Sequence, residues 1–206
     1  MRTIEELLDG YRRFRKGRYG EQKGLYAELA SGQDLEVMLI GCADSRADPS
    51  DIFDTAPGEL FTVRNVANLV PASDAGGSAD AMAASLEYAV CVLKVKHIVV
   101  MGHAGCGGVG AALTAGEGGE LPPRVAPWVA HLESARTVAL ATNPSDPQKA
   151  LEWAGIRQSL ANLESYPFVK EAVAAGDLNL HGAWFQIGGG ELHWLDSAKG
   201  IFCSVD

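Results

Sequence analysis

The chain has 206 residues, of which 47% are hydrophobic, and a formal net charge of −9 at pH 7. This is the composition of a globular protein with a sizeable core, and the negative charge argues against a nucleic acid as partner. The sequence holds no apolar run of about 18 residues that could span a membrane, and residues 1–20 lack the apolar core of a signal peptide. We therefore expect one domain over residues 1–206, cytoplasmic, with neither a nucleic acid nor a membrane as partner.

The first 34 residues predict a helical arm within that domain. Thr3 and Glu6 have the spacing of a capping box, in which each side chain accepts the backbone N–H of the other residue. Helical spacing of apolar residues follows at Ile4, Leu7, Leu8, Tyr11 and Phe14. A second short helical stretch with a loop is expected over residues 20–34. The pattern leaves open whether the arm packs on its own domain or on a second subunit.

Strands and helices alternate in the next part of the chain. Apolar runs predict strands over residues 35–41, 60–64 and 97–102. A short helix is expected from Pro49, with Asp48 as its N-cap. Two further helices are expected, one over residues 78–94 and one that begins at Gly107 and ends in a loop over residues 115–123. This order is typical of a parallel sheet with helices on its faces.

The C-terminal part adds two helices and a sheet edge. Helices are predicted over residues 124–141 and 147–165, the second capped by Asp146. Residues 178–187 and 191–195 alternate apolar and polar positions around three glycines, which indicates a hairpin. The expected fold is α/β, with a mainly parallel central sheet of four to five strands flanked by helices, an N-terminal helical extension and a C-terminal edge strand or hairpin.

Three metal-ligand side chains follow two of the predicted strands. Cys42 comes directly after the first strand, and His103 and Cys106 come after the third. Parallel strands end at one edge of a sheet, where ligands bind, so we expect the three side chains to converge. Two thiolates with one imidazole favour zinc, and a set of three leaves a coordination position open for catalysis. Taken singly, Cys42 could be a small buried residue and His103 a core histidine.

Other cysteine chemistries fit the spacing less well. A phosphatase loop needs an arginine six residues after the cysteine, but Arg46 is four residues after Cys42. The chain has no C-x-x-C pair for dithiol redox chemistry. Residues 105–110 are rich in glycine but lack the Lys-Ser/Thr of a nucleotide-binding loop.

The combined motifs resemble those of the β-class carbonic anhydrases, through Cys42-x-Asp44-x-Arg46 and His103-x-x-Cys106-Gly107-Gly108. The segments 58–68 and 86–90 also match that family, so the detailed resemblance covers about residues 30–110. It implies the reversible hydration of carbon dioxide to bicarbonate and a proton, by attack of zinc-bound hydroxide, with one Zn2+ per chain. It further implies a homodimer or a dimer of dimers, with the active site at the subunit interface.

The resemblance also assigns roles to residues around the metal. Asp44 would accept a hydrogen bond from the zinc hydroxide, and Arg46 would keep Asp44 ionised and oriented; a plain salt bridge in a turn is the alternative. Because two thiolates neutralise the charge of the metal, we expect activity to rise towards alkaline pH. As in the plant-like members, the substrate-binding residues would be Gln33, Phe61, Val66, Tyr88 and Gly107, with Gln33 as a hydrogen-bond donor.

One departure from the family concerns regulation. Some bacterial members bind bicarbonate at a regulatory site made of a Trp, an Arg and a Tyr, and these positions hold Leu39, Arg64 and Phe185 here. We therefore expect this site to be absent and the zinc to stay open to water at neutral pH. Whether Asp44 closes the zinc site at low pH is left open. The alternative functions are a carbon disulfide or carbonyl sulfide hydrolase on the same scaffold, or a non-catalytic zinc-stabilised protein.

Overall fold

The computed structural model describes residues 3–76 and 80–205, which fall into two compact units, Met1–Asp34 and Leu35–Asp206. The first unit is helical. Its first helix begins at the predicted capping box, because Thr3 Oγ1 accepts the Glu6 N–H at 3.2 Å and the Glu6 carboxylate accepts the Thr3 N–H at 2.6 Å. None of the described residues of this helix is buried. The helices are α1 (Ile4–Lys16), α2 (Arg18–Glu21) and α3 (Lys23–Leu29).

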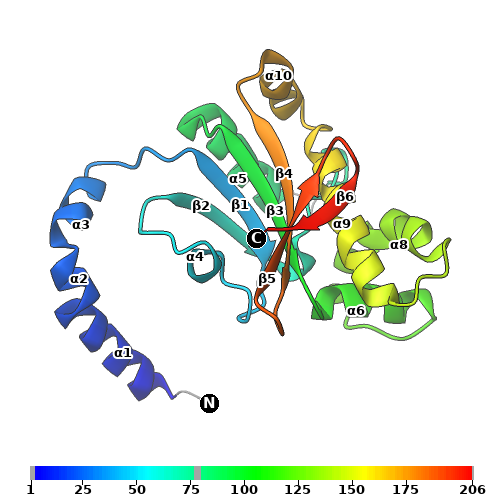
Figure 1. Ribbon diagram of the computed structural model, residues 1–206, viewed down its shortest axis with the longest axis horizontal. Coiled ribbons are helices and arrows are strands. Elements are labelled where there is room, and N and C mark those ends of the chain that lie inside the picture. Colours follow the sequence, from blue (N-terminus) through cyan, green and yellow to red (C-terminus); the bar gives the residue numbers. More distant parts are fainter. Residues whose placement is uncertain (1–2, 77–79, 206) are drawn as a thin grey trace. The chain divides into compact units, whose positions relative to one another are not determined.

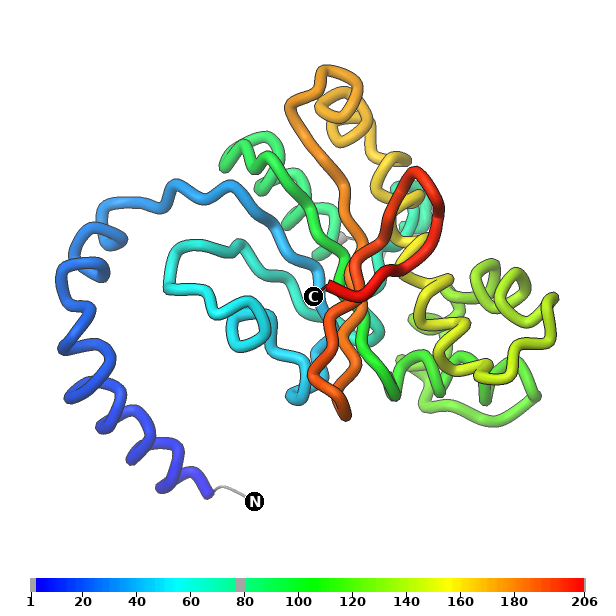
Figure 2. Tube along the Cα trace, in the orientation of Figure 1, coloured from blue at the N-terminus to red at the C-terminus, as the bar shows by residue number. Residues whose placement is uncertain are grey.

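The second unit is built on one sheet (Figures 1 and 2). Among the described residues the sheet has six strands in the order β2-β1-β3-β4-β5-β6. The first four strands in this order are parallel to one another. β5 pairs antiparallel with β4, as the predicted hairpin, and β6 pairs antiparallel with β5 and extends it. The strands are β1 (Val37–Cys42), β2 (Leu60–Asn65), β3 (His97–His103), β4 (Asn179–Gln186), β5 (Glu191–Asp196) and β6 (Ile201–Ser204).

The predicted α/β class with its edge hairpin is confirmed, and one more strand is present than expected. The additional strand is β6, which follows a turn in which the Asp196 carboxylate accepts the backbone N–H groups of Ala198 and Lys199. Of its residues only Phe202 is buried, so the short segment carries too weak an apolar pattern to be recognised from sequence.

The central strands are buried on both faces, which explains their continuous apolar runs. On β1 the side chains of Met38 and Ile40 join a large core. This core is covered by the helices α5 (Asp80–Glu87), η3 (Tyr88–Leu93), α9 (Pro147–Leu163) and α10 (Pro167–Ala175). Between Met38 and Ile40, Leu39 points to a second core on the other face, which it shares with Val99 of β3. β1 and β3 are neighbours with Val37 opposite His97, so their C-terminal ends lie side by side.

The helices agree with the predicted pattern except at three places. The helix expected over residues 78–94 continues from Tyr88 as a π-helix, and its start lies outside the described residues. The helix expected over residues 124–141 is interrupted by a 3-10 turn. A helix at Pro167–Ala175, between Pro167 and the left-handed Gly176 (φ 81°), was not expected although both residues signal its ends. The elements are α4 (Pro49–Ile52), η1 (Val66–Asn68), α5 (Asp80–Glu87), η3 (Tyr88–Leu93), α6 (Gly107–Gly116), α7 (Val125–Val129), η4 (Ala130–Leu132), α8 (Glu133–Leu140), α9 (Pro147–Leu163) and α10 (Pro167–Ala175).

Both predicted caps in this unit are present. Asp48 accepts the Ser50 N–H at the start of α4, and Asp146 accepts the Lys149 N–H at the start of α9. None of the helices in the described ranges has the length and apolar character needed to cross a membrane.

Candidate metal centre

The site lies at the C-terminal edge of the parallel strands, where the strand order reverses. β1 lies between β2 and β3, so the chain moves to one side of β1 to form β2 and then crosses to the other side to form β3. Ligands of an open α/β sheet usually bind at such a reversal. Cys42 is the last residue of β1 and His103 the last of β3. Two residues after β3, Gly105 adopts a left-handed conformation (φ 64°), and Cys106 then occupies the N-cap position of α6. The fold therefore places all three side chains at one point.

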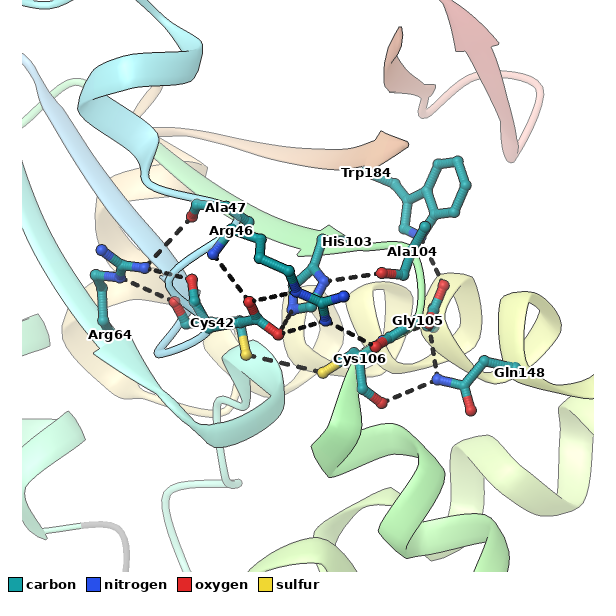
Figure 3. A network of polar contacts seen from close by, with 12 residues as sticks. Cys42, Arg46, Ala47, Arg64, His103, Ala104, Gly105, Cys106, Gln148 and Trp184 are labelled. Carbon is teal, nitrogen blue, oxygen red and sulfur yellow. Dashed lines mark hydrogen bonds and ion pairs between the residues drawn. The ribbon is translucent and has the colours of Figure 1, made fainter. Parts of the chain in front are cut away.

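The three side chains form a compact, buried set of metal ligands (Figure 3). Their ligand atoms lie within 4.8 Å of one another, and the three residues are between 1% and 5% exposed. The sulfur atoms of Cys42 and Cys106 are 3.8 Å apart. Two sulfur atoms bound at about 2.3 Å to one tetrahedral zinc ion would have about this separation. Among the described residues His103 Nε2 has no hydrogen-bond partner although it is buried. A metal ion would satisfy this nitrogen, so the residues fit the group.

The two thiols differ in acidity. Their mutual hydrogen bond lowers the pKa of Cys42 and raises the pKa of Cys106, because one proton shared between two sulfur atoms stabilises one thiolate. Backbone N–H groups of Asp44 and Ala67 also lower the pKa of Cys42. One thiolate is thus already favoured, and a metal ion that binds both sulfur atoms would displace the remaining proton to solvent.

A carboxylate–guanidinium pair lies beside the ligands. Arg46 donates from Nε to Asp44 Oδ1 at 3.0 Å and from Nη2 to Asp44 Oδ2 at 2.7 Å, and its backbone N–H donates to Oδ1 at 2.9 Å. Arg46 Nη2 also donates to the Gly105 carbonyl, which ties the loop after β1 to the loop after β3. These hydrogen bonds from Arg46 hold the pKa of Asp44 below its usual range. Asp44 Oδ2 lies 3.8 Å from His103 Nε2, so a fixed carboxylate faces the metal ligands.

A second arginine holds the backbone of the same loop (Figure 3). Arg64, on β2, donates from Nε to the Cys42 carbonyl at 2.9 Å and from Nη2 to the Asp44 carbonyl at 2.7 Å. Its Nη1 donates to Asp48 Oδ2 at 2.6 Å. Sequence reasoning treated Arg64 as the remainder of a regulatory site and missed this role. The contacts join residues about 20 positions apart, and a local pattern does not contain them.

Cys106 has its own supporting group, which sequence reasoning also missed. Glu152 of α9 accepts the backbone N–H of Cys106, and Gln148 donates to the Cys106 carbonyl. Nothing in the sequence around residues 148–152 identifies them, since they lie in an ordinary helix more than forty positions from Cys106.

The residues predicted to bind the substrate come from several different elements of the chain. Phe61 and Tyr88 are neighbours with ring centroids 6.0 Å apart, and Tyr88 is 46% exposed. Val66 is also exposed and packs next to Gly108 at the start of α6, while Gly107 is exposed in the same turn. Gln33 lies in an exposed loop of the first unit. Their role in substrate binding remains a prediction.

The two substituted regulatory positions also have clear places. Leu39 is 1% exposed in the core between the sheet and α4. Phe185 stands opposite His103 in the β3–β4 pairing, and its carbonyl accepts the Ala104 N–H. The absence of the regulatory site is not tested by these positions and remains a prediction.

Fold and site together define a class: an α/β protein with a Cys-His-Cys metal-binding cluster at the carboxyl edge of its parallel strands. The family model described as carbonic anhydrase matches residues 37–192. A carbonic anhydrase of Pseudomonas aeruginosa is 37% identical over 98% of this chain and 92% of its own length. A carbonic anhydrase of Synechococcus elongatus is 32% identical over 98% of this chain and 75% of its own length. The chain belongs to the carbonic anhydrase family of enzymes, in its β class.

Solved structures agree with this assignment. The beta-carbonic anhydrase CcaA has a TM-score of 0.92 and 30% identity, with 98% of this chain and 99% of that chain covered. A structure described among two tetrameric beta-carbonic anhydrases of Sordaria macrospora has a TM-score of 0.82 and 29% identity, with 98% of each chain covered. The N-terminal helices of the present chain and the six-stranded mixed sheet of its described residues place it in the same fold.

Proposed function

We propose that the chain catalyses the zinc-dependent, reversible hydration of carbon dioxide to bicarbonate and a proton. The observation that carries the proposal is the Cys42–His103–Cys106 cluster with a fixed carboxylate, Asp44, beside it. The three ligands would bind one Zn2+ per chain. When bound, zinc would lower the pKa of water from about 15.7 towards about 7 and so supply hydroxide near neutral pH.

Asp44 would act as the acceptor that orients the nucleophile. Its Oδ2 receives one N–H from Arg46, so a lone pair of that oxygen is free to accept a hydrogen bond from the attacking hydroxide. This hydrogen bond would turn an oxygen lone pair towards the carbon of the substrate. Arg46 would keep Asp44 charged and in one rotamer, because the planar fork of the guanidinium matches the carboxylate. These roles distinguish an oriented site from a turn that merely contains a salt bridge.

The substrate pocket is proposed to be apolar and shared between subunits. Carbon dioxide is small and apolar, which suits Phe61, Val66 and Tyr88, with Gln33 as hydrogen-bond donor and Gly107 beside the metal. The exposure of Tyr88 and Val66 fits a pocket that a second chain completes. We accordingly propose a homodimer or a dimer of dimers in the cytoplasm.

We also propose that the metal site stays open at neutral pH. The guanidinium of Arg64 is committed to Asp48 and to the carbonyls of Cys42 and Asp44. These contacts support an Arg64 that holds the loop and does not bind a regulatory anion. A crystal structure of the zinc enzyme at about pH 7.5 with Asp44 bound directly to the metal would contradict this proposal.

Stopped-flow hydration of carbon dioxide against pH, with zinc quantified on the same sample, tests the function. We expect one zinc per chain and a rate that rises towards alkaline pH. Side-by-side assays with carbon disulfide and carbonyl sulfide separate the hydrolase alternative, since the same ligand set could serve it. Stoichiometric zinc without hydration at any pH would instead support a non-catalytic, zinc-stabilised protein.

A further inference from the structure

Helix α9 holds the backbone of Cys106 with two side chains one turn apart. Glu152 Oε1 accepts the Cys106 N–H at 2.9 Å, and Gln148 Nε2 donates to the Cys106 carbonyl at 2.9 Å. The same Gln148 amide donates to Glu152 Oε1 at 2.8 Å, so the two side chains also fix each other. Figure 3 shows Gln148 next to Cys106 in this arrangement. Both backbone polar groups of one metal-ligand residue are thus tied to one helix.

Among the described residues, the donors to the buried Glu152 carboxylate are neutral. Glu152 is 3% exposed, and its second oxygen accepts Nε1–H of the buried Trp184, on β4, at 2.9 Å. None of the ion pairs formed by the described residues includes Glu152. A buried carboxylate is costly to desolvate, and apolar packing would stabilise such a place as well or better. Its presence is therefore better explained by what it holds, and it holds Cys106.

The direction of the Cys106 side chain depends on this contact. Cys106 is the N-cap of α6, with extended backbone angles (φ −65°, ψ 119°), and its N–H is outside the hydrogen bonds of the helix. An acceptor fixed on α9 sets the position of that N–H and with it the direction of the Cα–Cβ bond. The sulfur is thereby placed 3.8 Å from the sulfur of Cys42. Groups that fix metal ligands commonly change metal affinity about 10–100-fold when they are lost.

We propose that Glu152, supported by Gln148 and Trp184, is a positioning residue that preorganises Cys106 for zinc. The inference rests on the proposed zinc site and adds a residue that sets how firmly the metal is held. Because Glu152 acts through Cys106, the effect of its loss belongs first to zinc retention and only then to turnover.

The test is the rate at which the zinc-loaded protein releases zinc to a chromogenic chelator, well below the unfolding temperature of every variant. Glu152→Gln keeps one acceptor oxygen where the carboxylate has two, and its NH2 group faces an N–H donor. We expect release about 10–100-fold faster than from the unmodified protein. Ser159→Ala is the matched control, because Ser159 is buried on the same helix and accepts a backbone N–H, that of Val70, away from the metal site. We expect the parent rate for this control.

Two further measurements complete the test. In cobalt-substituted protein the thiolate-to-metal charge-transfer band should weaken in Glu152→Gln and stay unchanged in Ser159→Ala. If Glu152→Gln does not fold, Trp184→Phe removes the Nε1–H donor together with part of the buried ring, and well below its unfolding temperature it should give a smaller effect in the same direction. Parent release rates, or release that only follows the loss of thermal stability in all variants, would overturn the inference. A parent protein that binds no zinc would instead overturn the proposed function.

Discussion

Two arginines hold the loop after β1, each with a different task. Arg64 binds main-chain carbonyls and fixes the path of the loop, whereas Arg46 binds the Asp44 carboxylate on both oxygens. Because the hydrogen bonds from Arg46 are the largest cause of the lowered pKa of Asp44, the orientation and charge of this carboxylate depend chiefly on one neighbour. Single side chains at this loop therefore have separable effects on metal binding and turnover.

Asp44→Asn should leave the metal in place and lower the hydration rate. The amide cannot supply the charged acceptor that the mechanism needs, so we expect a fall in kcat of about 100-fold or more with unchanged zinc content. Stopped-flow rates and metal analysis on one sample measure both quantities. Asp196→Asn, which removes a half-buried carboxylate paired with Lys199, is the control. Full activity of Asp44→Asn would refute the role given to Asp44.

The pH profile follows from the lowered pKa of Asp44. A carboxyl whose pKa is depressed is ionised at every pH above that value, so Asp44 keeps its charge between about pH 6 and about pH 9. The decline in rate as pH falls through this range should therefore be no steeper than one titrating group requires. A second protonation step in the profile of kcat/KM, absent from Asp44→Asn, would contradict the assignment of a low pKa.

At the scale of elements, α6 starts in close contact with η1. A Cβ at Gly108 would lie 2.5 Å from Val66 Cγ1 and 2.9 Å from Ala67 Cβ, while a Cβ at the adjacent Gly107 would meet nothing within 4 Å. Ala67 has a left-handed backbone (φ 64°), so η1 has little freedom to move away. The glycine at 108 is required by packing, and the glycine at 107 is not.

Gly108→Ala and Gly107→Ala are therefore a matched pair. We expect Gly108→Ala to lower the free energy of unfolding by about 1–3 kcal/mol through overpacking. Gly107→Ala should be neutral or slightly stabilising, because alanine is the better helix former. Denaturant unfolding of the zinc-loaded variants measures the difference. Equal stabilities would show that η1 yields to the added methyl group, and a loss of activity confined to Gly107→Ala would support its proposed place beside the substrate.

At the scale of the whole molecule, exposed apolar side chains next to the proposed pocket predict association. Tyr88 and Val92, one turn apart on η3, are 46% and 60% exposed. We expect a solution mass that is an even multiple of 21.7 kDa by light scattering. Val92→Glu should weaken the dimer because it places a charge in an apolar interface. Val138→Glu, at an exposed position on α8, should leave the mass unchanged. A monomeric parent protein would contradict the shared pocket.

Local signals in the sequence were sufficient for much of the fold. The capping box at Thr3, the caps at Asp48 and Asp146, and the apolar runs of β1 and β3 each depend on neighbouring residues, and each was predicted. The break between α7 and α8 involves a distant segment, since Gln158 of α9 donates to the His131 carbonyl and accepts the Ala135 N–H. No local period records such contacts. The strand β6 pairs with the neighbouring β5 and was missed because only Phe202 of its residues is buried.

The sequence by itself determined the ligand types and their place after two parallel strands, because residue identity and strand pattern are local properties. Only the tertiary structure decided what holds those ligands. Arg64 is 22 positions from Cys42, and Glu152 is 46 positions from Cys106. The packing of β2 and α9 in the folded chain brings these partners next to the metal ligands. Hydrogen bonds between remote segments exist only once the chain has folded, and these bonds fix the geometry at which a metal could be held.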